Sequence, residues 1–200
     1  MPVRQRAEPL APDERRKAIL EAVIPLVIER GPNVTTAEMA RAAGIAEGTI
    51  FRVFPDKPTL LHEALKSSFD PAPTLERLAN IERALPLEIQ LRKAAAIILD
   101  RAERVHALAA VLRSMPHGGH ADHTGTHKAA IEASSMIFWG LTRLFRDEAD
   151  RLAVEPARAA AAFRGLLYAL TTPLCDPKEL MTTDEAIDIL LNGVLRQDAS

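Results

Sequence analysis

The stretch TTAEMARAAGIAEGTIFRVFPDK, residues 35–57, decides the fold of the N-terminal part of this chain. Thr35 and Glu38 have the spacing of a capping box, which predicts that a short helix begins here. Gly44 predicts where that helix ends in a sharp turn, because glycine adopts a positive φ without strain. A second short helix is predicted over residues 47–54. This pattern is typical of a helix-turn-helix, whose second helix enters the DNA major groove, and it also fits an αα-corner without a DNA role.

The two predicted helices carry the small and aliphatic residues that a close crossing needs. Ala40, four residues before Gly44, lets the helices approach each other, and Ile45 is expected to fill the corner between them. Pro55 is expected to stop the second helix, and Asp56 to cap the next one. The residues expected to face the core are Met39, Ala40, Ala43, Ile50 and Val53.

Proline and glycine divide the rest of the chain into helical segments, without the alternation that strands show. Asp13 is the expected N-cap of the first helix, and Thr182 with Glu185 forms a second capping-box pattern near the last. The predicted fold class is therefore all-α, with a small helical head and a larger bundle. Helices are expected at 13–30, 57–65, 74–84, 86–115, 127–153, 156–171 and 184–196, with a Gly- and His-rich loop at 116–126.

Composition and charge narrow the class of protein further. Hydrophobic residues make up 48% of the 200 residues and charged residues 26%, which suits a sizeable core in a water-soluble chain. The net charge of −2 excludes a polybasic protein that binds nucleic acid by bulk charge alone. The single cysteine, Cys175, cannot form an intrachain disulfide and favours a cytoplasmic location. Neither a signal peptide nor a membrane span is expected.

Residues 36–60 resemble the DNA-binding head of the TetR family of transcriptional regulators. The preceding segment, with Ile19, Ala22 and Gly31, is similar to the first helix of that family. The resemblance covers about residues 13–73. It implies a three-helix helix-turn-helix head there, with the motif at about 36–55, and a variable helical body at 74–200 that binds ligands and dimerises. The positions that carry the resemblance are Thr36, Ala40, Gly44, Ile45, Gly48, Thr49, Ile50, Phe51, Phe54, Lys57 and Leu60.

The resemblance also implies roles for individual residues. Thr36 looks like a phosphate contact, because its hydroxyl coincides with the free backbone donors of a helix N-terminus. Lys57 resembles the phosphate-contacting lysine of the family, although an ordinary solvated lysine would fit the same position. Thr49 is expected to contact phosphate or a base edge. The expected base readers are Glu47, Gly48, Thr49 and Arg52, and Glu47 could equally be a charge that suits a helix start.

Two positions depart from the family pattern. Phe51 stands where the family usually has a phosphate-contacting tyrosine, so it keeps the packing and loses the hydroxyl. Val53 stands where His or Tyr is common and offers no hydrogen bond. Arginines are therefore expected to supply more of the DNA affinity than usual, namely Arg41, Arg52 and the N-terminal Arg4 and Arg6.

The body is predicted to be a sensor. By resemblance, the helices between residues 86 and 168 should enclose a ligand cavity, with Arg101, Arg104 or Arg113 as possible polar groups. The candidate lining residues fit a plain hydrophobic core as well, because Met and aromatic residues on helices commonly pack there. They are Met115, Met136, Phe138, Trp139 and Phe163.

Four histidines within eleven residues form the one cluster with metal-binding potential. Imidazoles three and four residues apart would share a helix face and could chelate zinc, nickel or copper. Gly118, Gly119 and Gly125 argue against a continuous helix here, so a connector without a metal is the favoured interpretation. The four candidates are His117, His120, His123 and His127.

The predicted function is a cytoplasmic transcriptional repressor that a small-molecule effector releases from operator DNA. The chain has no nucleophile elbow, Walker loop or dinucleotide fingerprint, so neither an enzyme nor a cofactor is expected. A homodimer is expected through the apolar faces at 156–171 and 184–196, because such proteins normally bind half-sites in pairs. The alternatives are a metal-responsive protein that uses the histidine cluster, and a DNA-binding protein without an effector.

Overall fold

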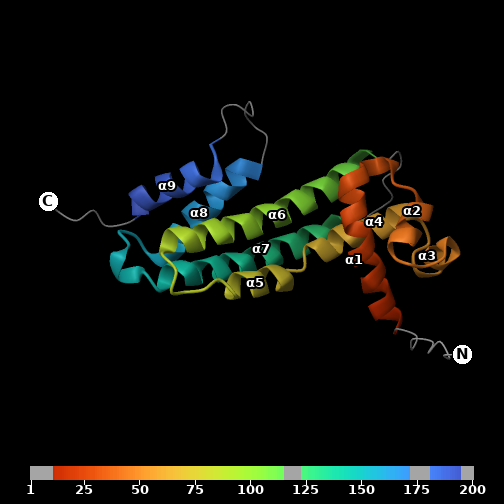
Figure 1. The fold of residues 1–200 in the computed structure, drawn as a ribbon, viewed down its shortest axis with the longest axis horizontal. Coiled ribbons are helices and arrows are strands. Elements are labelled where there is room, and N and C mark those ends of the chain that lie inside the picture. The colour runs from red at the N-terminus through yellow and green to blue at the C-terminus, as the bar shows by residue number, and fades with distance from the viewer. Residues whose placement is uncertain (1–10, 115–122, 172–180, 195–200) are drawn as a thin grey trace, which may run out of the picture. The chain divides into compact units, whose positions relative to one another are not determined.

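The computed structural model describes residues 11–114, 123–171 and 181–194, and all regular structure in these ranges is helical (Figure 1). The all-α prediction is thereby confirmed. Along the chain the helices are α1 (Pro12–Arg30), α2 (Thr36–Ala42), α3 (Glu47–Val53), α4 (Lys57–Ser68), α5 (Ala72–Ala79), α6 (Leu87–Ser114), α7 (His123–Arg146), α8 (Pro156–Thr171) and α9 (Thr183–Val194). Short 3-10 turns lie at Gly31–Asn33 and Ala149–Arg151.

The chain forms two compact units, and each is built from two separate parts of the sequence. The head unit contains residues up to 67 together with 106–121, and the body unit contains 68–105 and the residues from 122 onward. The sequence predicts a contiguous head at 13–73. The difference arises because the end of α6 supplies Leu108, Val111 and Leu112 to the core of the head unit.

The core of the head unit is made from one face of each of its helices. Met39 and Ala40 of α2 and Ile50 of α3 are buried, and Val53 packs against them, as predicted from the sequence. Phe54, directly after α3, is completely buried. Helices of seven residues are marginal in isolation, so this packing is what holds α2 and α3 in place. The other core residues are Ile19, Leu20, Val23, Val27, Val34, Leu60, Leu61 and Ala64.

The body unit has a core of its own, formed by α5 to α9. Helix α8 packs against both α7 and α9. The rings of Phe145 and Phe163 meet edge to face, with centroids 6.1 Å apart. Helices α5 and α7 come close at Gly140, where a Cβ would lie only 2.9 Å from Cδ2 of Leu75. Glycine at this position leaves room for the end of the Leu75 side chain.

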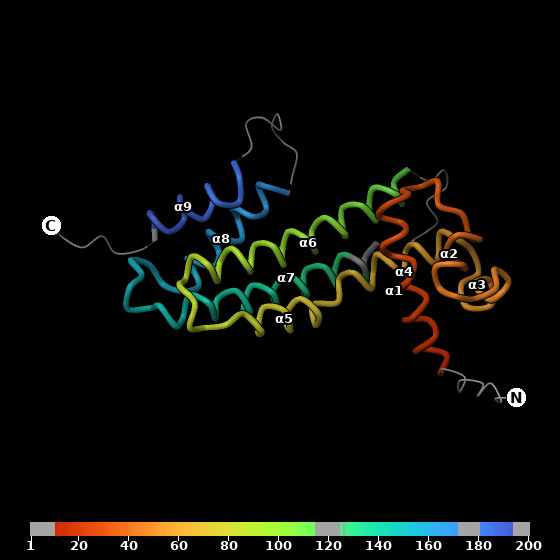
Figure 2. The backbone as a smooth tube through the Cα atoms, in the orientation of Figure 1, coloured from red at the N-terminus to blue at the C-terminus, as the bar shows by residue number. Residues whose placement is uncertain are grey.

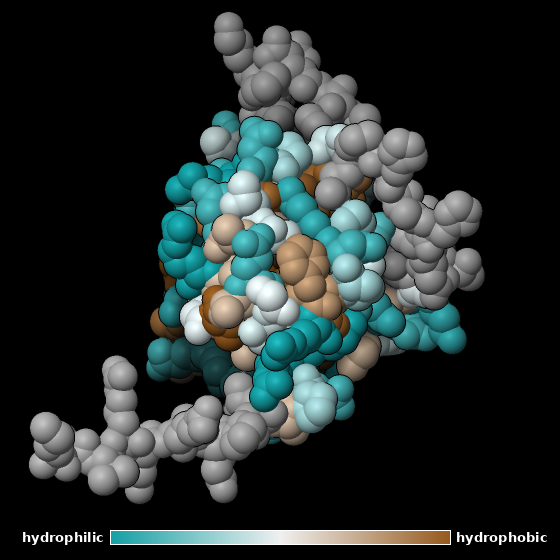
Figure 3. Space-filling view, turned by 90° about the vertical axis from the view of Figure 1, so that its right-hand side faces the viewer, coloured by the Kyte–Doolittle hydropathy of each residue, from teal (hydrophilic) through white to brown (hydrophobic). Residues whose placement is uncertain are grey.

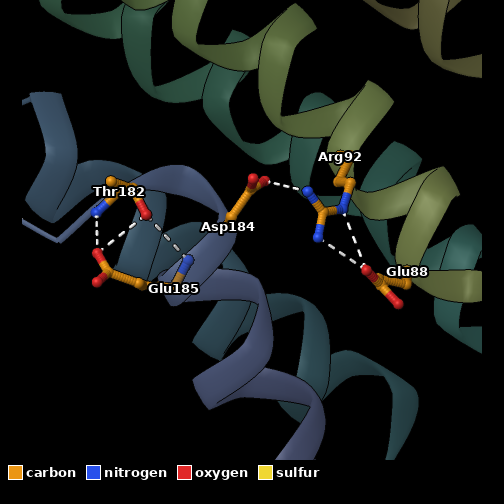
Figure 4. Close-up of polar contacts among 5 residues, drawn as sticks. All are labelled: Glu88, Arg92, Thr182, Asp184 and Glu185. Atoms are coloured by element: carbon orange, nitrogen blue, oxygen red, sulfur yellow. Dashed lines mark hydrogen bonds and ion pairs between the residues drawn. The ribbon is translucent and has the colours of Figure 1, made fainter.

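Polar contacts fix the start of α9 (Figure 4). The backbone N–H and the hydroxyl of Thr182 donate to the carboxylate of Glu185, at 2.6 and 2.9 Å, which confirms the predicted capping box. Arg92 of α6 pairs with Asp184 in the first turn of α9 and with Glu88 one turn away on α6. These charges therefore connect the N-terminal part of α6 to the start of α9.

Some predicted helix boundaries are wrong. Helix α1 begins at Pro12 rather than after an Asp13 cap, since Glu14 accepts a hydrogen bond from the backbone N–H of Ala11. Helix α7 begins at His123, so the expected loop at 116–126 ends earlier than predicted and Gly125 is helical. In the described ranges, no helix combines the length and the apolar character that crossing a bilayer requires.

Candidate nucleic-acid interface

The start of α2 is fixed by the predicted capping box. The backbone N–H of Thr35 donates to the Glu38 carboxylate at 2.9 Å, and the backbone N–H of Glu38 donates to the Thr35 hydroxyl at 3.2 Å. These hydrogen bonds lower the pKa of the Glu38 carboxyl, chiefly through the Thr35 backbone N–H. The carboxylate therefore stays charged at neutral pH, as the positive end of a helix dipole favours.

The turn between α2 and α3 depends on Gly44, whose φ is 67°. Its N–H donates to the Arg41 carbonyl at 3.1 Å, and the N–H of Ile45 donates to the Ala40 carbonyl at 2.9 Å. This pair of hydrogen bonds is a Schellman motif, which needs a residue in the left-handed region at the position of Gly44. Helices α2 and α3 lie next to each other in the head unit (Figure 2).

Helix α3 is buried on one face and open on the other. Its inner face places Ile50 in the core, while Glu47, Gly48 and Arg52 are exposed and Thr49 is half-buried. Phe51 is 47% exposed, although it is a large apolar residue. Figure 3 views the side of the molecule that carries α2 and α3. The surface there is largely hydrophilic, with some apolar residues. The side chains predicted to read bases therefore lie on the accessible side of α3.

Thr36 and Glu47 contact each other across the two helices. Thr36 is the first residue of α2, and its hydroxyl donates a hydrogen bond to the carboxylate of Glu47, in the first turn of α3. The sequence predicts Thr36 as a phosphate contact and Glu47 as a base reader. The hydroxyl of Thr36 thus has a partner within the protein, and its phosphate contact stays a prediction.

Lys57 also has partners within the head unit. Its ammonium group donates to the carbonyls of Pro32, at 3.0 Å, and Val34, at 2.6 Å. The side chain links the segment before α2 to the first turn of α4, where Asp56 accepts a hydrogen bond of 2.7 Å from the Thr59 backbone N–H. That contact lowers the pKa of the Asp56 carboxyl and confirms its predicted capping role.

Arg16 of α1 is not among the residues predicted from the sequence. Its guanidinium contacts Glu63 of α4, the carbonyl of Val53 at the end of α3, and the ring of Phe54. The partners lie 37 to 47 residues away along the chain, so no local pattern points to the contact. Arg41 is exposed on α2, as its predicted DNA contact requires.

The predicted ligand-binding residues that the structure describes differ widely in their exposure. Met136 and Trp139 are 51% and 59% exposed on α7, whereas Phe163 is buried against Phe145. Phe138 is half-buried, next to the Trp139 ring and below the guanidinium of Arg164. Met115 lies outside the described residues. The role of these residues in ligand binding stays a prediction.

Two of the three arginines suggested as polar groups of the cavity, Arg101 and Arg104, have partners within the protein. Arg101 donates to the carbonyls of Asp70 and Phe69, at 2.8 and 2.9 Å, and burial lowers the pKa of its guanidinium. Arg104 pairs with Asp100, one turn away on α6. Arg101 thus contacts backbone carbonyls just after the end of α4, and Arg104 pairs with a residue of its own helix.

The histidine cluster can be placed only in part. His117 and His120 lie outside the described residues, while His123 and His127 belong to the first turns of α7. Among the described residues, no group of three or more His, Cys, Asp or Glu side chains is arranged to hold a metal ion. The metal-responsive alternative therefore gains no support from the part of the chain that the structure describes.

The structure thus combines a helix-turn-helix in one unit with a second unit built only from helices in its described residues. Residues 19–64 match the family described as bacterial regulatory proteins, tetR family. The head of this chain is thus a TetR-type helix-turn-helix domain, and the resemblance drawn from its sequence is confirmed.

Solved structures share the fold of this protein over more than nine tenths of the chain. A TetR-family protein from Mesorhizobium loti is 19% identical, with 94% of this chain and 100% of that one covered and a TM-score of 0.61. A TetR regulator from Streptomyces coelicolor is 21% identical, with 92% and 99% covered and a TM-score of 0.58. The superantigen PfiT is 18% identical, with 94% and 100% covered and a TM-score of 0.58. Because a protein described as a superantigen shares this fold, the fold alone does not establish the function of this chain.

Proposed function

We propose that this protein is a dimeric transcriptional repressor that binds operator DNA through α3 and is released when a small molecule binds the body unit. The proposed activity is binding, without catalysis, and its site of action is the cytoplasm. The observation that supports it best is the two-sided character of α3. Ile50 anchors the helix in the core, and Glu47, Gly48 and Arg52 stand exposed on the face that a DNA major groove would meet.

The proposed contacts divide into two kinds. Glu47, Gly48, Thr49 and Arg52 would read base edges, whereas Thr36, Arg41 and Lys57 would contact phosphates. Phe51 would contribute apolar contact, because it has no hydroxyl to offer a phosphate. Since α3 is short, one head would read only a few base pairs, and two heads are needed to define an operator.

Selection from genomic fragments, followed by gel shifts at several salt concentrations, tests the DNA-binding half of the proposal. We expect an enriched palindrome and an affinity that falls steeply as salt rises. Arg52→Ala should relax base preference at one position of each half-site by about 1–3 kcal/mol. Recovery of fragments with no shared sequence would refute operator binding.

The proposed dimer would form through α8 and α9. Both helices bury one face in the body unit through Leu167 and Ile187, while Tyr168 and Ile189 are 65% and 57% exposed. Large apolar side chains at these positions are the kind that a two-fold helical interface covers. Analytical ultracentrifugation of Ile189→Asp should show dissociation. Ile131→Asp, at a site 53% exposed on α7, is the matched control and should stay dimeric.

The effector half of the proposal can be tested with the single tryptophan of the chain, Trp139. A ligand that binds near Phe138 and Trp139 should change the fluorescence of this residue and raise the melting temperature. Release from DNA requires that the ligand bind the DNA-incompetent state more tightly, since equal affinity for both states shifts nothing. A ligand that raises the melting temperature without weakening operator binding would contradict its role as an effector.

A further inference from the structure

Arg16 of α1 lies at the point where three helices of the head unit meet. Its Nη1 donates a hydrogen bond of 2.9 Å to the carbonyl of Val53, the last residue of α3. Its Nε and Nη2 donate to the two carboxylate oxygens of Glu63 on α4. Its Cζ lies 4.7 Å from the centroid of the buried Phe54 ring. One side chain thus contacts both the C-terminal end of α3 and the residue that follows it.

The hydrogen bond to Val53 gives a partner to a carbonyl at the C-terminal end of α3. The last carbonyls of any helix have no partner within the helix, and α3 has only seven residues. A cation at the C-terminal end also compensates the negative end of the helix dipole. With Ile50 in the core, the guanidinium therefore gives α3 a second fixed point, about one turn further along.

Glu63 determines how the guanidinium is oriented. Its two oxygens accept from two different nitrogens, which fixes the plane of the group and directs the remaining nitrogen at Val53. The hydrogen bond with Glu63 also raises the pKa of Arg16. A lysine could not reproduce this geometry, because its ammonium is a point donor rather than a planar fork.

We propose that Arg16 is a positioning residue for DNA recognition, which fixes α3 in the head unit and does not itself bind phosphate. The proposal rests on the proposed function, since α3 is the helix assigned to the major groove. Glu63 balances the charge of Arg16, and each of the three guanidinium nitrogens donates a hydrogen bond to a group of the head unit. Loss of Arg16 should therefore affect sequence reading rather than the electrostatic attraction to DNA.

Gel shifts with Arg16→Ala, compared with Lys17→Ala, test this inference. Lys17→Ala removes the same charge one position along α1. The Lys17 side chain is 77% exposed and pairs with Glu21 at 3.8 Å. For Arg16→Ala we expect operator affinity to fall by about tenfold, with the salt dependence and the affinity for random DNA unchanged. Lys17→Ala should leave operator affinity within about twofold.

Two results with DNA would overturn the proposal. A salt slope that decreases by about 0.9 in Arg16→Ala would identify Arg16 as a phosphate contact. Operator affinity equal to that of Lys17→Ala would show that α3 does not need the guanidinium. Arg16→Lys and Glu63→Gln are milder variants for the case in which Arg16→Ala does not fold, and both should lose part of the operator affinity.

Amide hydrogen exchange tests the positioning of α3 without DNA. The N–H of Phe54 donates to the Ile50 carbonyl at 2.8 Å and reports the last turn of α3. In Glu63→Gln and Arg16→Lys it should exchange faster than in Lys17→Ala, while amides of α8 do not change. Unchanged exchange at Phe54 would overturn the proposal. Faster exchange in a protein that selects no DNA sequence would support the positioning role and refute the proposed function alone.

Discussion

The ammonium group of Lys57 donates a hydrogen bond of 2.6 Å to the carbonyl of Val34, which precedes the α2 capping box. A second hydrogen bond, of 3.0 Å, reaches the carbonyl of Pro32. An ammonium has three protons, so one is left for a DNA phosphate. The residue that the sequence predicts as a phosphate contact is therefore also a structural link between α4 and the segment before α2.

Replacement of Lys57 by alanine should reduce both stability and DNA affinity. The two carbonyls would lose their charged donor, and we expect unfolding in urea to require about 1–2 kcal/mol less. If the third proton contacts a phosphate, the slope of log affinity against log salt should decrease by about 0.9. Lys66→Ala, at an exposed position in the last turn of α4, is the control. A slope equal to that of the control would restrict Lys57 to its structural role.

Replacement of Glu47 by glutamine should separate its two possible roles. If the carboxylate reads a cytosine amino group, Glu47→Gln should relax preference at one base pair by about 1–3 kcal/mol. If Glu47 is only a favourable charge at the start of α3, base preference should not change. Thr36→Val keeps the side-chain shape and removes the hydroxyl that donates to Glu47. If the Thr36 hydroxyl orients the Glu47 carboxylate toward the base, selection experiments with both variants should show a relaxed preference at the same base pair.

The features that the sequence predicts correctly in the head are local ones. Thr35 with Glu38, and Gly44 with the residues before it, act within a few positions, so their spacing alone indicates the turn. The hydrogen bonds of Arg16 and Lys57 join residues 23 to 47 positions apart. A long side chain is compatible with many partners, and only the folded chain selects among them.

The same distinction between local and non-local contacts applies to the body. Burial of Phe163 and exposure of Trp139 depend on which neighbouring helices cover each face, and the sequence does not state this. The part that α6 plays in the core of the head unit is equally non-local, because Leu108 is 40 residues from the end of α4 along the chain. At the start of α7, the glycines suggested a loop, yet the helix includes Gly125.

Gly48→Ala should stabilise the protein and weaken operator binding. A Cβ at this position would meet no atom within 4 Å, so alanine should add about 1 kcal/mol through its helix propensity. Gly48 lies on the exposed side of α3, where the predicted contact brings DNA close to the backbone. Thermal unfolding and gel shifts on the same sample test both effects. Undiminished operator affinity would show that DNA does not approach Gly48 closely.

Stability should decrease on acidification because the capping carboxylates become protonated. The pKa values of Glu38 and Glu185 are lowered, first by backbone N–H groups of Thr35 and Thr182 and then by the hydroxyls of the same residues. A lowered pKa in the folded state stabilises the protein above the unfolded-state pKa. This contribution is lost as the pH falls from about 5 through the folded-state values.

Glutamine variants test this pH dependence. Glu38→Gln and Glu185→Gln should be less stable than the wild type at pH 7, and the differences should shrink as the pH falls below about 5. Urea unfolding at each pH gives the comparison. Glu132→Gln, at an exposed position of α7 that caps no helix, is the control. A destabilisation of the two capping variants that is constant from pH 7 to pH 3 would contradict the role of ionisation.

Gly140→Ala should stabilise the protein less than Gly48→Ala, although both glycines lie inside α-helices. Each substitution gains about 1 kcal/mol of helix propensity. At Gly140, however, the new methyl group would lie 2.9 Å from Cδ2 of Leu75 and 3.5 Å from Cδ1 of Leu78, so the Leu75 side chain must move. Displacing a packed side chain costs about 1–3 kcal/mol, which should cancel or exceed the gain.

Urea unfolding of both glycine variants measures the difference directly. Gly140→Ala with Leu75→Ala should recover part of the loss, because the truncated side chain leaves room for the methyl group. The double variant still lacks the apolar contacts of Leu75, so it should be compared with Leu75→Ala rather than with the wild type. If Gly140→Ala is less destabilising in the Leu75→Ala background than in the wild type, the Leu75 side chain is what limits the space at Gly140. Strict additivity, with Gly140→Ala as stable as Gly48→Ala, would show that the two helices tolerate a side chain between them.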